Sequence, residues 1–357
     1  MNPYWTALAG ELTPYVPGEQ PRIADLVKLN TNESPFGPSP LALAAIRNAA
    51  TDELRLYPDP EATELRETLA AYHGVEAGQV FVGNGSDEVL AHAFAGLLKH
   101  DLPLLFPDIT YSFYPVYAKL FGVSYETVAL DKSMRANVAD YRRPAGAIVI
   151  ANPNAPTGVA LSLGEIAALV DDHPDIPVVV DEAYVDFGGE SALALLPGRT
   201  NLLIVRTMSK SRALAGLRVG YAIGDAGLIE ALNRVKDSFN SYPLGRPAQA
   251  GAIASVKDEG HFRASVAAVV RGREALTRGL AELGFEVLPS SANFVFSRHP
   301  ARSGLDWAKE LRAHAVLVRH FDKPRIAGYL RITVGAEANT GRLLTACRSI
   351  LRNEQAI

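Results

Sequence analysis

The sequence predicts an α/β protein, with a mostly parallel sheet covered by helices on both faces and a smaller α+β domain at the C-terminal end. Helical patterns alternate with short apolar runs from Leu41 onward. These runs are continuous and rich in β-branched residues, as expected for strands that are buried on both faces. After Gly260 the pattern changes to a long amphipathic helix followed by separated strands. We therefore expect an N-terminal arm over residues 1–40, a large domain over 41–258 and a small domain over 259–357.

The arm is expected to be extended, because residues 12–40 are dense in Pro, Gly, Asn and Ser. Each later helix or strand is predicted from the spacing of its apolar residues and from the residues that flank it. In the large domain we expect helices at 41–50, 61–74, 86–99 and 163–173, and strands within 79–83, 145–153, 176–184, 200–208 and 219–224. In the small domain we expect helices at about 261–283 and 340–354, beside strands within 285–299 and 329–335.

Composition narrows the class of protein. The 357 residues are 48% hydrophobic, which is enough for a large core. With 35 basic and 39 acidic residues, the net charge is -4. The sequence therefore shows neither the excess of basic residues expected of a nucleic-acid-binding protein nor a basic segment that would bind a membrane. The single cysteine, Cys347, excludes an internal disulfide framework, and the chain shows no leader pattern, so we expect a cytoplasmic protein.

A turn after the strand at 79–83 could hold a phosphate. Gly83 and Gly85 are followed by Ser86 and Asp87 at the start of a helix, where free backbone N–H groups and the helix dipole favour an anion. The other interpretation is an ordinary helix cap, since Ser and Asp are common caps. The turn lacks the GxGxxG pattern and a Walker lysine, so a nucleotide site is disfavoured.

Polar residues also follow the next predicted strands. Asn152, Asn154 and Thr157 lie in the loop "NPNAPTG", which could equally be a simple turn. Asp181 and Glu182 end a strongly apolar strand, where a carboxylate needs a cationic partner or several donors, unless Asp181 only caps a helix. The carboxyl ends of such strands are where ligands bind in open α/β sheets.

Lys210, in "TMSKSRALAG", follows another strand and would share this edge of the sheet. A partly desolvated lysine is a nucleophile that forms a Schiff base with an aldehyde. Arg218 and Ser209 could bind a phosphate on the same molecule. An aldehyde that carries a phosphate and a basic ring nitrogen fits these groups, which points to pyridoxal 5'-phosphate.

These motifs resemble a known family. "TMSKSRALAG", "NPNAPTG" and "DEAY" are similar, in order and spacing, to the fingerprints of class II pyridoxal-phosphate aminotransferases of fold type I. The likeness covers nearly the whole chain. "LTPYVPGE", "LNTNESPFGPSP", "YPDP", "GNGSDE", "SANFVF" and "LRITVG" look like the histidinol-phosphate aminotransferases within that class.

The resemblance implies a role for each residue around the cofactor ring. Lys210 would bind pyridoxal 5'-phosphate covalently and move the proton at the substrate Cα. Asp181 would pair with the ring nitrogen, Asn152 and Tyr184 would bond to the 3'-oxygen, and Tyr111 would stack on the ring.

The cofactor phosphate would be held by Ser86 and Asp87, largely through their backbone, together with Ser209 and Arg218. By the same resemblance, Tyr57 would reach this phosphate from a second subunit. The family therefore implies a homodimer with shared active sites.

The implied reaction is a reversible amino transfer between L-histidinol phosphate and 2-oxoglutarate, giving imidazole acetol phosphate and L-glutamate in histidine biosynthesis. Arg319 and Arg331 are the candidates for binding the anionic end of either substrate, since a guanidinium suits both phosphate and carboxylate. Arg319 could instead be an ordinary surface residue. Tyr15 and Asn32 are expected to close over the substrate beside Asn152.

Several alternatives remain open at this stage. An aromatic amino-acid aminotransferase or a pyridoxal-phosphate-dependent threonine-phosphate decarboxylase would share the cofactor residues. Gly245 and Pro247 depart from the commoner family pattern, and "RHFDKPRIAG" occurs in only part of the family, so substrate preference is less constrained. A non-catalytic binding protein could dispense with Lys210, and a serine hydrolase would require an S-x-x-K pattern that this lysine lacks. No metal site is expected, because the eight histidines show no paired metal spacing.

Overall fold

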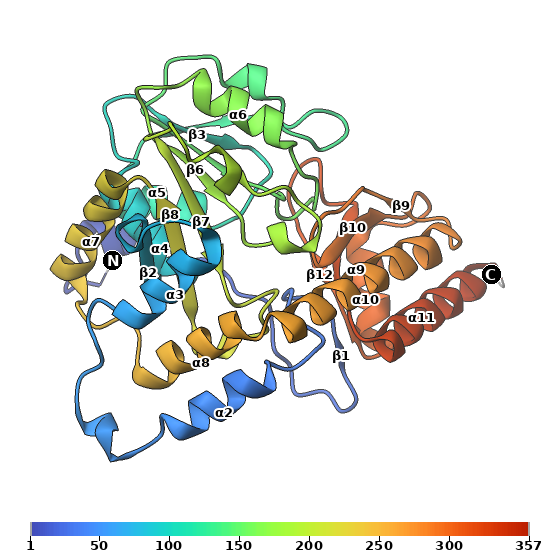
Figure 1. Cartoon of the computed structure of the whole chain (residues 1–357). Helices are drawn as coiled ribbons and strands as arrows, with labels where there is room; N and C mark the ends of the chain where they lie inside the picture. Colours follow the sequence, from blue (N-terminus) through green and yellow to red (C-terminus); the bar gives the residue numbers. More distant parts are fainter. Residues whose placement is uncertain (1, 356–357) are drawn as a thin grey trace.

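The computed structural model describes residues 2–355. Residue 1 of the expected arm and residues 356–357 of the expected small domain lie outside the described residues. Within the described range, seven strands form the main sheet in the order β2-β8-β7-β6-β5-β3-β4 (Figure 1). Strand β8 is antiparallel to both neighbours, whereas β7, β6, β5, β3 and β4 pair in parallel, which confirms a mostly parallel sheet. The strands are β2 (Val80–Asn84), β3 (Leu104–Pro107), β4 (Tyr125–Val128), β5 (Ala147–Ala151), β6 (Val178–Asp181), β7 (Leu202–Thr207) and β8 (Val219–Gly224).

Strand β8 reverses direction because only a short loop with one 3-10 turn separates it from β7. A parallel partner would need a helical crossover, whereas an antiparallel partner does not. This short loop is the one that contains Lys210.

Both faces of the sheet are covered, as the continuous apolar strands predict. Val149 and Val179 pack on one face in a cluster with α4 (Gly85–Gly96), α5 (Tyr114–Phe121) and α7 (Ala226–Phe239). Ile150 and Val180, one residue further along each strand, pack on the other face with α6 (Leu163–Asp171). The remaining helices on this side of the molecule are α2 (Pro40–Asn48), α3 (Thr63–His73) and α8 (Arg246–Lys257), of which α3 and α8 pack against β2 and β8.

Local sequence sets where these helices begin. Ser162 and Glu165 form a capping box at α6, each side chain bonding to the backbone of the other. At α2 the Ser39 hydroxyl accepts the N–H of Ala42, and Pro40 occupies the first position, where its missing N–H costs nothing.

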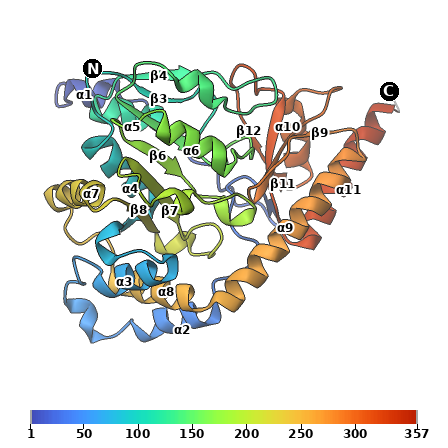
Figure 2. The ribbon, with the colours of Figure 1, turned by 45° about the horizontal axis from the view of Figure 1, so that its top comes forward.

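A second, antiparallel sheet in the order β12-β13-β10-β9 belongs to the C-terminal part of the described chain. Its strands are β9 (Glu286–Val287), β10 (Phe294–Arg298), β12 (Arg319–His320) and β13 (Tyr329–Thr333). Figure 2 shows the long helix α9 (Glu259–Ala281) running from the region of α8 toward this sheet, beside α11 (Glu337–Gln355). Their apolar faces, with that of α10 (Gly304–Ala313), form one core around Trp307 and Leu343.

The N-terminal segment reaches this second core. After the short helix α1 (Ala7–Glu11), residues 12–26 form no helix or strand, as predicted for an extended arm. Strand β1 (Val27–Lys28) then pairs in parallel with β11 (Val316–Leu317). None of the helices in the described range is long and apolar enough to cross a membrane.

Candidate active site

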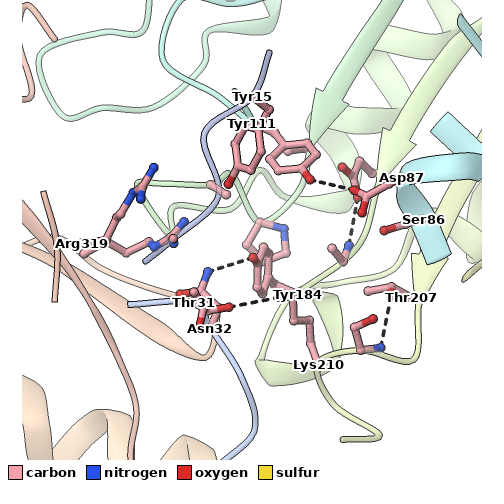
Figure 3. Close-up of a pocket in the computed structure, with 18 of the residues that line it drawn as sticks. Tyr15, Thr31, Asn32, Ser86, Asp87, Tyr111, Tyr184, Thr207, Lys210 and Arg319 are labelled. Atoms are coloured by element: carbon pink, nitrogen blue, oxygen red, sulfur yellow. Dashed lines mark hydrogen bonds between the residues drawn. The ribbon is translucent and has the colours of Figure 1, made fainter. Parts of the chain in front are cut away.

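A cavity of about 150 Å³ opens where β5, β6 and β7 end, between the main sheet, the small sheet and the arm (Figure 3). Ala151, Asp181 and Thr207, the last residues of those three strands, all line it. The cavity therefore lies at the edge of the sheet that the sequence indicated. Of the predicted site residues, those that line it are Tyr15, Asn32, Ser86, Asp87, Tyr111, Asp181, Tyr184, Ser209, Lys210, Arg218, Arg319 and Arg331.

Lys210 lies at the floor of this cavity in the loop between β7 and β8. Its Nζ is 3.5 Å from the carbonyl oxygen of Thr31 and 5.8 Å from the centre of the Tyr184 ring. These are weak contacts, so the ammonium group is loosely held. Such an amine can turn toward a bound aldehyde.

Asp181 is buried at the end of β6 and faces the cavity. The Tyr114 hydroxyl donates to its Oδ2 at 3.0 Å, and the Ala183 N–H donates to its Oδ1 at 3.2 Å. Burial raises the pKa of Asp181 to about 6, although the hydrogen bond from Tyr114 lowers it. A cation placed against this carboxylate would favour its charged form.

Glu182, the neighbouring carboxylate, does not line the cavity. Arg206 Nε donates to its Oε2 at 3.0 Å, and the Ala192 N–H donates to its Oε1 at 2.6 Å. Successive side chains along a strand point to opposite faces, which explains why only Asp181 is available to a ligand.

The predicted phosphate turn is built by close backbone packing. Gly85 has a left-handed φ of 79°, and a Cβ added at Gly220 would lie 2.2 Å from the Ser86 nitrogen, so both positions need glycine. Helix α4 begins at Gly85 with Asn84 as its cap, so Ser86 and Asp87 belong to the first turn and are not the cap themselves. Both Ser86 and Asp87 line the cavity.

Asp87 is the centre of a hydrogen-bonded group in this turn. Its Oδ2 accepts from Arg218 Nη2 at 2.9 Å, and its Oδ1 accepts from the Tyr111 hydroxyl at 2.8 Å (Figure 3). Tyr117 donates to the Asp87 carbonyl at 3.0 Å. Arg218 thus lies beside the predicted phosphate turn with its charge partly balanced by Asp87.

Residues of the N-terminal arm form another wall of the cavity. Asn32 Nδ2 donates to the Tyr184 hydroxyl at 2.8 Å, and the Asn32 backbone N–H donates to Thr333 Oγ1 at 3.0 Å. The Tyr15 ring stacks on Phe113, with 4.3 Å between ring centres. Tyr15 and Asn32 therefore both line the cavity.

Two arginines enter from the small sheet on neighbouring strands, since Arg319 pairs with Arg331 in the register of β12 and β13. Arg331 Nη2 donates to the Asn30 carbonyl at 3.0 Å, while its Nε is buried without a hydrogen-bond partner in the described part of the chain. Burial lowers the pKa of Arg331. Arg319 is partly exposed and donates to the Val16 carbonyl at 3.2 Å.

Two predicted residues are not in this cavity. Asn152 was expected at the cofactor and the substrate, but its Oδ1 accepts the Leu161 N–H at 2.8 Å and its Nδ2 donates to the Leu161 carbonyl at 3.2 Å. Both polar atoms are thus used to hold the loop, and Ala155 and Pro153 line the cavity instead. Tyr57 is 76% exposed and stacks on Tyr242. It does not line the cavity of its own chain.

Sequence reasoning also missed residues that belong to the site. Thr207 could have been found from its place at the carboxyl end of a predicted strand, and Thr31 from its place inside the "LNTNES" motif. Tyr114, three residues after Tyr111, gave no separate signal because its partner Asp181 is distant in sequence. Gly18 and Asn30 complete the unpredicted lining of the arm.

The residues present fit pyridoxal 5'-phosphate. Ser209 Oγ is buried beside the turn without a partner in the described range, so it can donate to a phosphate oxygen. The close approach of Gly220 to Ser86 keeps side chains away from the helix start, where an anion binds. The buried Asp181 carboxylate suits a protonated ring nitrogen.

Comparison with known proteins places the chain in a family. The model of the family described as "Aminotransferase class I and II" matches residues 24–350. The chain belongs to this family. It is 63% identical over 351 residues to "Histidinol-phosphate aminotransferase 2" of Rhizobium meliloti, covering 98% of this chain and 100% of that protein. It is 62% identical to "Histidinol-phosphate aminotransferase 1" of Bradyrhizobium diazoefficiens, with the same coverage.

The fold agrees with this membership. A crystal structure of histidinol-phosphate aminotransferase from Sinorhizobium meliloti in complex with pyridoxal-5'-phosphate superposes with a TM-score of 0.87 at 25% sequence identity, over 98% of each chain. This aminotransferase therefore has the fold type I architecture that its motifs indicated.

Proposed function

We propose that this aminotransferase is a pyridoxal-phosphate-dependent histidinol-phosphate aminotransferase. The observation that carries the proposal is one cavity in which Lys210 and Asp181 lie opposite two arginines, Arg319 and Arg331. The high identity to full-length relatives of that name supports it. When bound, pyridoxal phosphate supplies an electron sink for the negative charge left at the substrate Cα after a proton is removed.

The cofactor-binding roles follow from the positions of the side chains. Ser209, the Ser86–Asp87 turn and Arg218 would hold the phosphate, and Asp181 would hold the protonated ring nitrogen. Tyr184 would meet the 3'-oxygen, and Tyr111 would cover one ring face. Lys210 would hold the aldehyde carbon in the resting enzyme.

Lys210 also has the proton-transfer role. Its weak contacts leave the amine free to accept a proton from the substrate Cα and deliver it elsewhere, which is general acid–base catalysis. Asp181 would support this step by stabilising a positive charge on the ring nitrogen. Asn32 orients Tyr184 through their hydrogen bond and so closes the site on the arm side.

The two arginines define the substrate class. The Arg331 guanidinium has a buried Nε with no partner among the described residues, and it favours an anion with several acceptor oxygens, which both a phosphate ester and a carboxylate of glutamate bring. The same pair can therefore bind histidinol phosphate in one half-reaction and 2-oxoglutarate in the other. Turnover is then ping-pong.

Spectral titration tests this assignment. L-Histidinol phosphate added to the purified holoenzyme should convert the bound aldehyde to the amine form at much lower concentration than phenylalanine does. Product analysis should show imidazole acetol phosphate and no carbon dioxide. A preference for phenylalanine would instead indicate an aromatic aminotransferase, and released carbon dioxide with threonine phosphate would indicate the decarboxylase.

We also propose a homodimer with shared active sites. Tyr57 and Phe239 are 76% and 78% exposed, and the neighbouring Leu54, Leu56 and Tyr242 also expose apolar surface, which is typical of a contact face. Tyr57 can serve a cofactor phosphate only from a second copy, because it does not line its own cavity. Mixing inactive Lys210→Ala and Tyr57→Ala proteins should restore part of the activity if sites are shared; no recovery would contradict it.

A cytoplasmic location is part of the same proposal. It is supported by the single cysteine, Cys347, which is buried and free. Cell fractionation with marker enzymes tests it.

A further inference from the structure

A buried polar cluster lies outside the cavity and consists of Glu182, Asp186, Arg206 and Ser211, called here the Arg206 cluster. Arg206 Nε donates to Glu182 Oε2 at 3.0 Å, and its Nη1 donates to Asp186 Oδ1 at 3.4 Å. The Ser211 hydroxyl donates to Asp186 Oδ2 at 2.5 Å. None of the four residues lines the cavity.

Each member of the cluster lies within two positions of a cavity residue in the sequence. Glu182 follows Asp181, and Ser211 follows Lys210. Arg206 precedes Thr207, and Asp186 is two residues after Tyr184. The cluster therefore joins the segment that carries Asp181 and Tyr184 to the segment that carries Lys210, on the side away from the ligand.

Burying the charged groups of this cluster costs free energy, so its presence calls for a structural reason. Glu182 is 2% exposed and Arg206 is 8% exposed, and burial raises the pKa of Glu182. Buried ion pairs of this kind contribute little net stability compared with apolar packing, but a fully satisfied polar network fixes a single geometry. Glu182 is satisfied by Arg206, by the Ser191 hydroxyl at 2.8 Å and by the Ala192 N–H.

Other groups around Arg206 add to the rigidity. The Tyr221 ring belongs to β8, the strand that follows the lysine loop, and its hydroxyl lies 3.1 Å from His73 Nε2. Tyr221, Asp186 and Glu182 together favour the charged form of Arg206 against the effect of burial. Arg212, next to Ser211, is anchored separately through the Ser255 carbonyl and the Phe262 ring.

We propose that Asp186 and Ser211 are positioning residues, whose hydrogen bond fixes the lysine loop against the 3-10 turn Val185–Phe187, which follows β6 and Tyr184, and thereby sets the direction of the Lys210 amine relative to Asp181. The inference rests on the proposed function only in requiring that Lys210 holds pyridoxal phosphate. Because Ser211 is adjacent to Lys210, loss of its anchor changes the lysine before it changes the rest of the fold.

Two serine variants separate this role from general stability. Ser211→Ala removes the hydroxyl that anchors the lysine loop, whereas Ser191→Ala removes a hydroxyl bonded to the same cluster at Glu182 but remote in sequence from Lys210. Asp186→Asn is a third variant, which keeps an acceptor for Ser211 but removes the charge beside Arg206. For each apoprotein we would measure the dissociation constant of pyridoxal phosphate and the thermal unfolding midpoint, and for each holoenzyme the visible circular dichroism of the bound cofactor.

Ser211→Ala should weaken pyridoxal phosphate binding about tenfold, the size expected for one lost charge-assisted hydrogen bond, and Asp186→Asn should weaken it less, because its amide oxygen still accepts from Ser211. They should also reduce the visible circular dichroism, which reports the orientation of the bound cofactor. Ser191→Ala should lower the unfolding midpoint while leaving both cofactor readouts at the wild-type value.

The inference is overturned if Ser211→Ala binds pyridoxal phosphate like the wild type with an unchanged spectrum, or if Ser191→Ala alters both readouts equally. If Asp186→Asn does not fold, the two serine variants decide the question alone. Borohydride reduction of the wild-type holoenzyme separates this outcome from failure of the proposed function: a Lys210 peptide without a pyridoxyl group contradicts the proposed function itself, whereas a labelled peptide with unaltered Ser211→Ala readouts contradicts this inference alone.

Discussion

The Tyr114 hydroxyl donates a hydrogen bond to the Asp181 carboxylate, with 3.0 Å between Oη and Oδ2, and both side chains are buried. Tyr114 comes from the start of α5 and Asp181 from the end of β6, so a helix on one face of the sheet holds the carboxylate that faces the cavity. This bond keeps Asp181 oriented even without a cation beside it.

The first prediction concerns pH and the stability of the apoprotein. The folded-state pKa of Asp181 is raised to about 6 by burial, above its ordinary value of 3.8, so the folded state holds this proton more tightly than the unfolded state. The contribution to stability is then present at low pH and is lost as the pH rises from about 4 to about 6, by at most about 3 kcal/mol. Urea unfolding should show this decline in wild type and not in Asp181→Asn.

Tyr114→Phe refines the same experiment. Removing the hydroxyl takes away an interaction that lowers the pKa of Asp181, so the decline should extend to higher pH than in wild type. An identical pH profile for wild type and Asp181→Asn would show that this carboxylate does not titrate as described.

Lys210→Ala should abolish transamination while pyridoxal phosphate still binds noncovalently through the phosphate turn. The amine that moves the Cα proton is lost, whereas Ser209 and Arg218 remain. The measurements are steady-state activity and the absorbance of the bound cofactor, with added methylamine as a chemical rescue. Normal turnover by this variant would remove Lys210 from the mechanism.

Arg331→Lys keeps the positive charge but loses the planar fork of the guanidinium. We expect KM to rise about tenfold or more for both histidinol phosphate and glutamate, and further in Arg331→Ala, because a buried charged hydrogen bond contributes about 1.5–3 kcal/mol. Arg319→Lys is the comparison and should have a smaller effect, because among the described residues Arg331 has a buried nitrogen without a partner and Arg319 has none. Unchanged KM values would exclude Arg331 from the anion site.

Gly220→Ala should disrupt the phosphate turn. The added Cβ would lie 2.2 Å from the Ser86 nitrogen and 2.3 Å from the Gly85 carbonyl carbon, and backbone atoms on both sides leave no room to relax. We expect a loss of about 3 kcal/mol or more in stability and much weaker pyridoxal phosphate binding. Gly216→Ala is the matched control, since nothing lies within 4 Å of its added Cβ, and it should resemble wild type in both assays.

Strand ends were predictable from the sequence because apolar runs and the residues after them are local features. The runs at 145–153, 176–184 and 200–208 each contain a strand of the main sheet. The last residues of these three strands all line the cavity. Strands β3 and β4 were not predicted: β3 lies between Pro103 and its own last residue, Pro107, and proline disfavours a strand interior, while β4 is an edge strand whose first three residues are exposed.

Side-chain direction within a loop was not predictable in the same way. The motif "NPNAPTG" correctly located a loop at the cavity, yet in the structure Asn152 bonds to Leu161 and Ala155 lines the cavity. Which residue of such a loop faces the cavity depends here on hydrogen bonds from the Asn152 side chain to backbone groups of Leu161, nine residues away. The pairing of Asp87 with Arg218 is likewise a contact across 131 positions, which no local pattern reveals.

The docking of the arm on the small sheet has a consequence for biosynthesis of the chain. Thr333 donates its N–H to Leu29, Asn293 donates to the Asn32 carbonyl, and Thr31 lies beside Lys210. One wall of the vitamin-binding cavity thus consists of residues made early that are held in place by residues made about 300 positions later. A nascent polypeptide on the ribosome cannot complete this wall until Thr333 has emerged, so the cavity is completed only after every strand of the main sheet has been made.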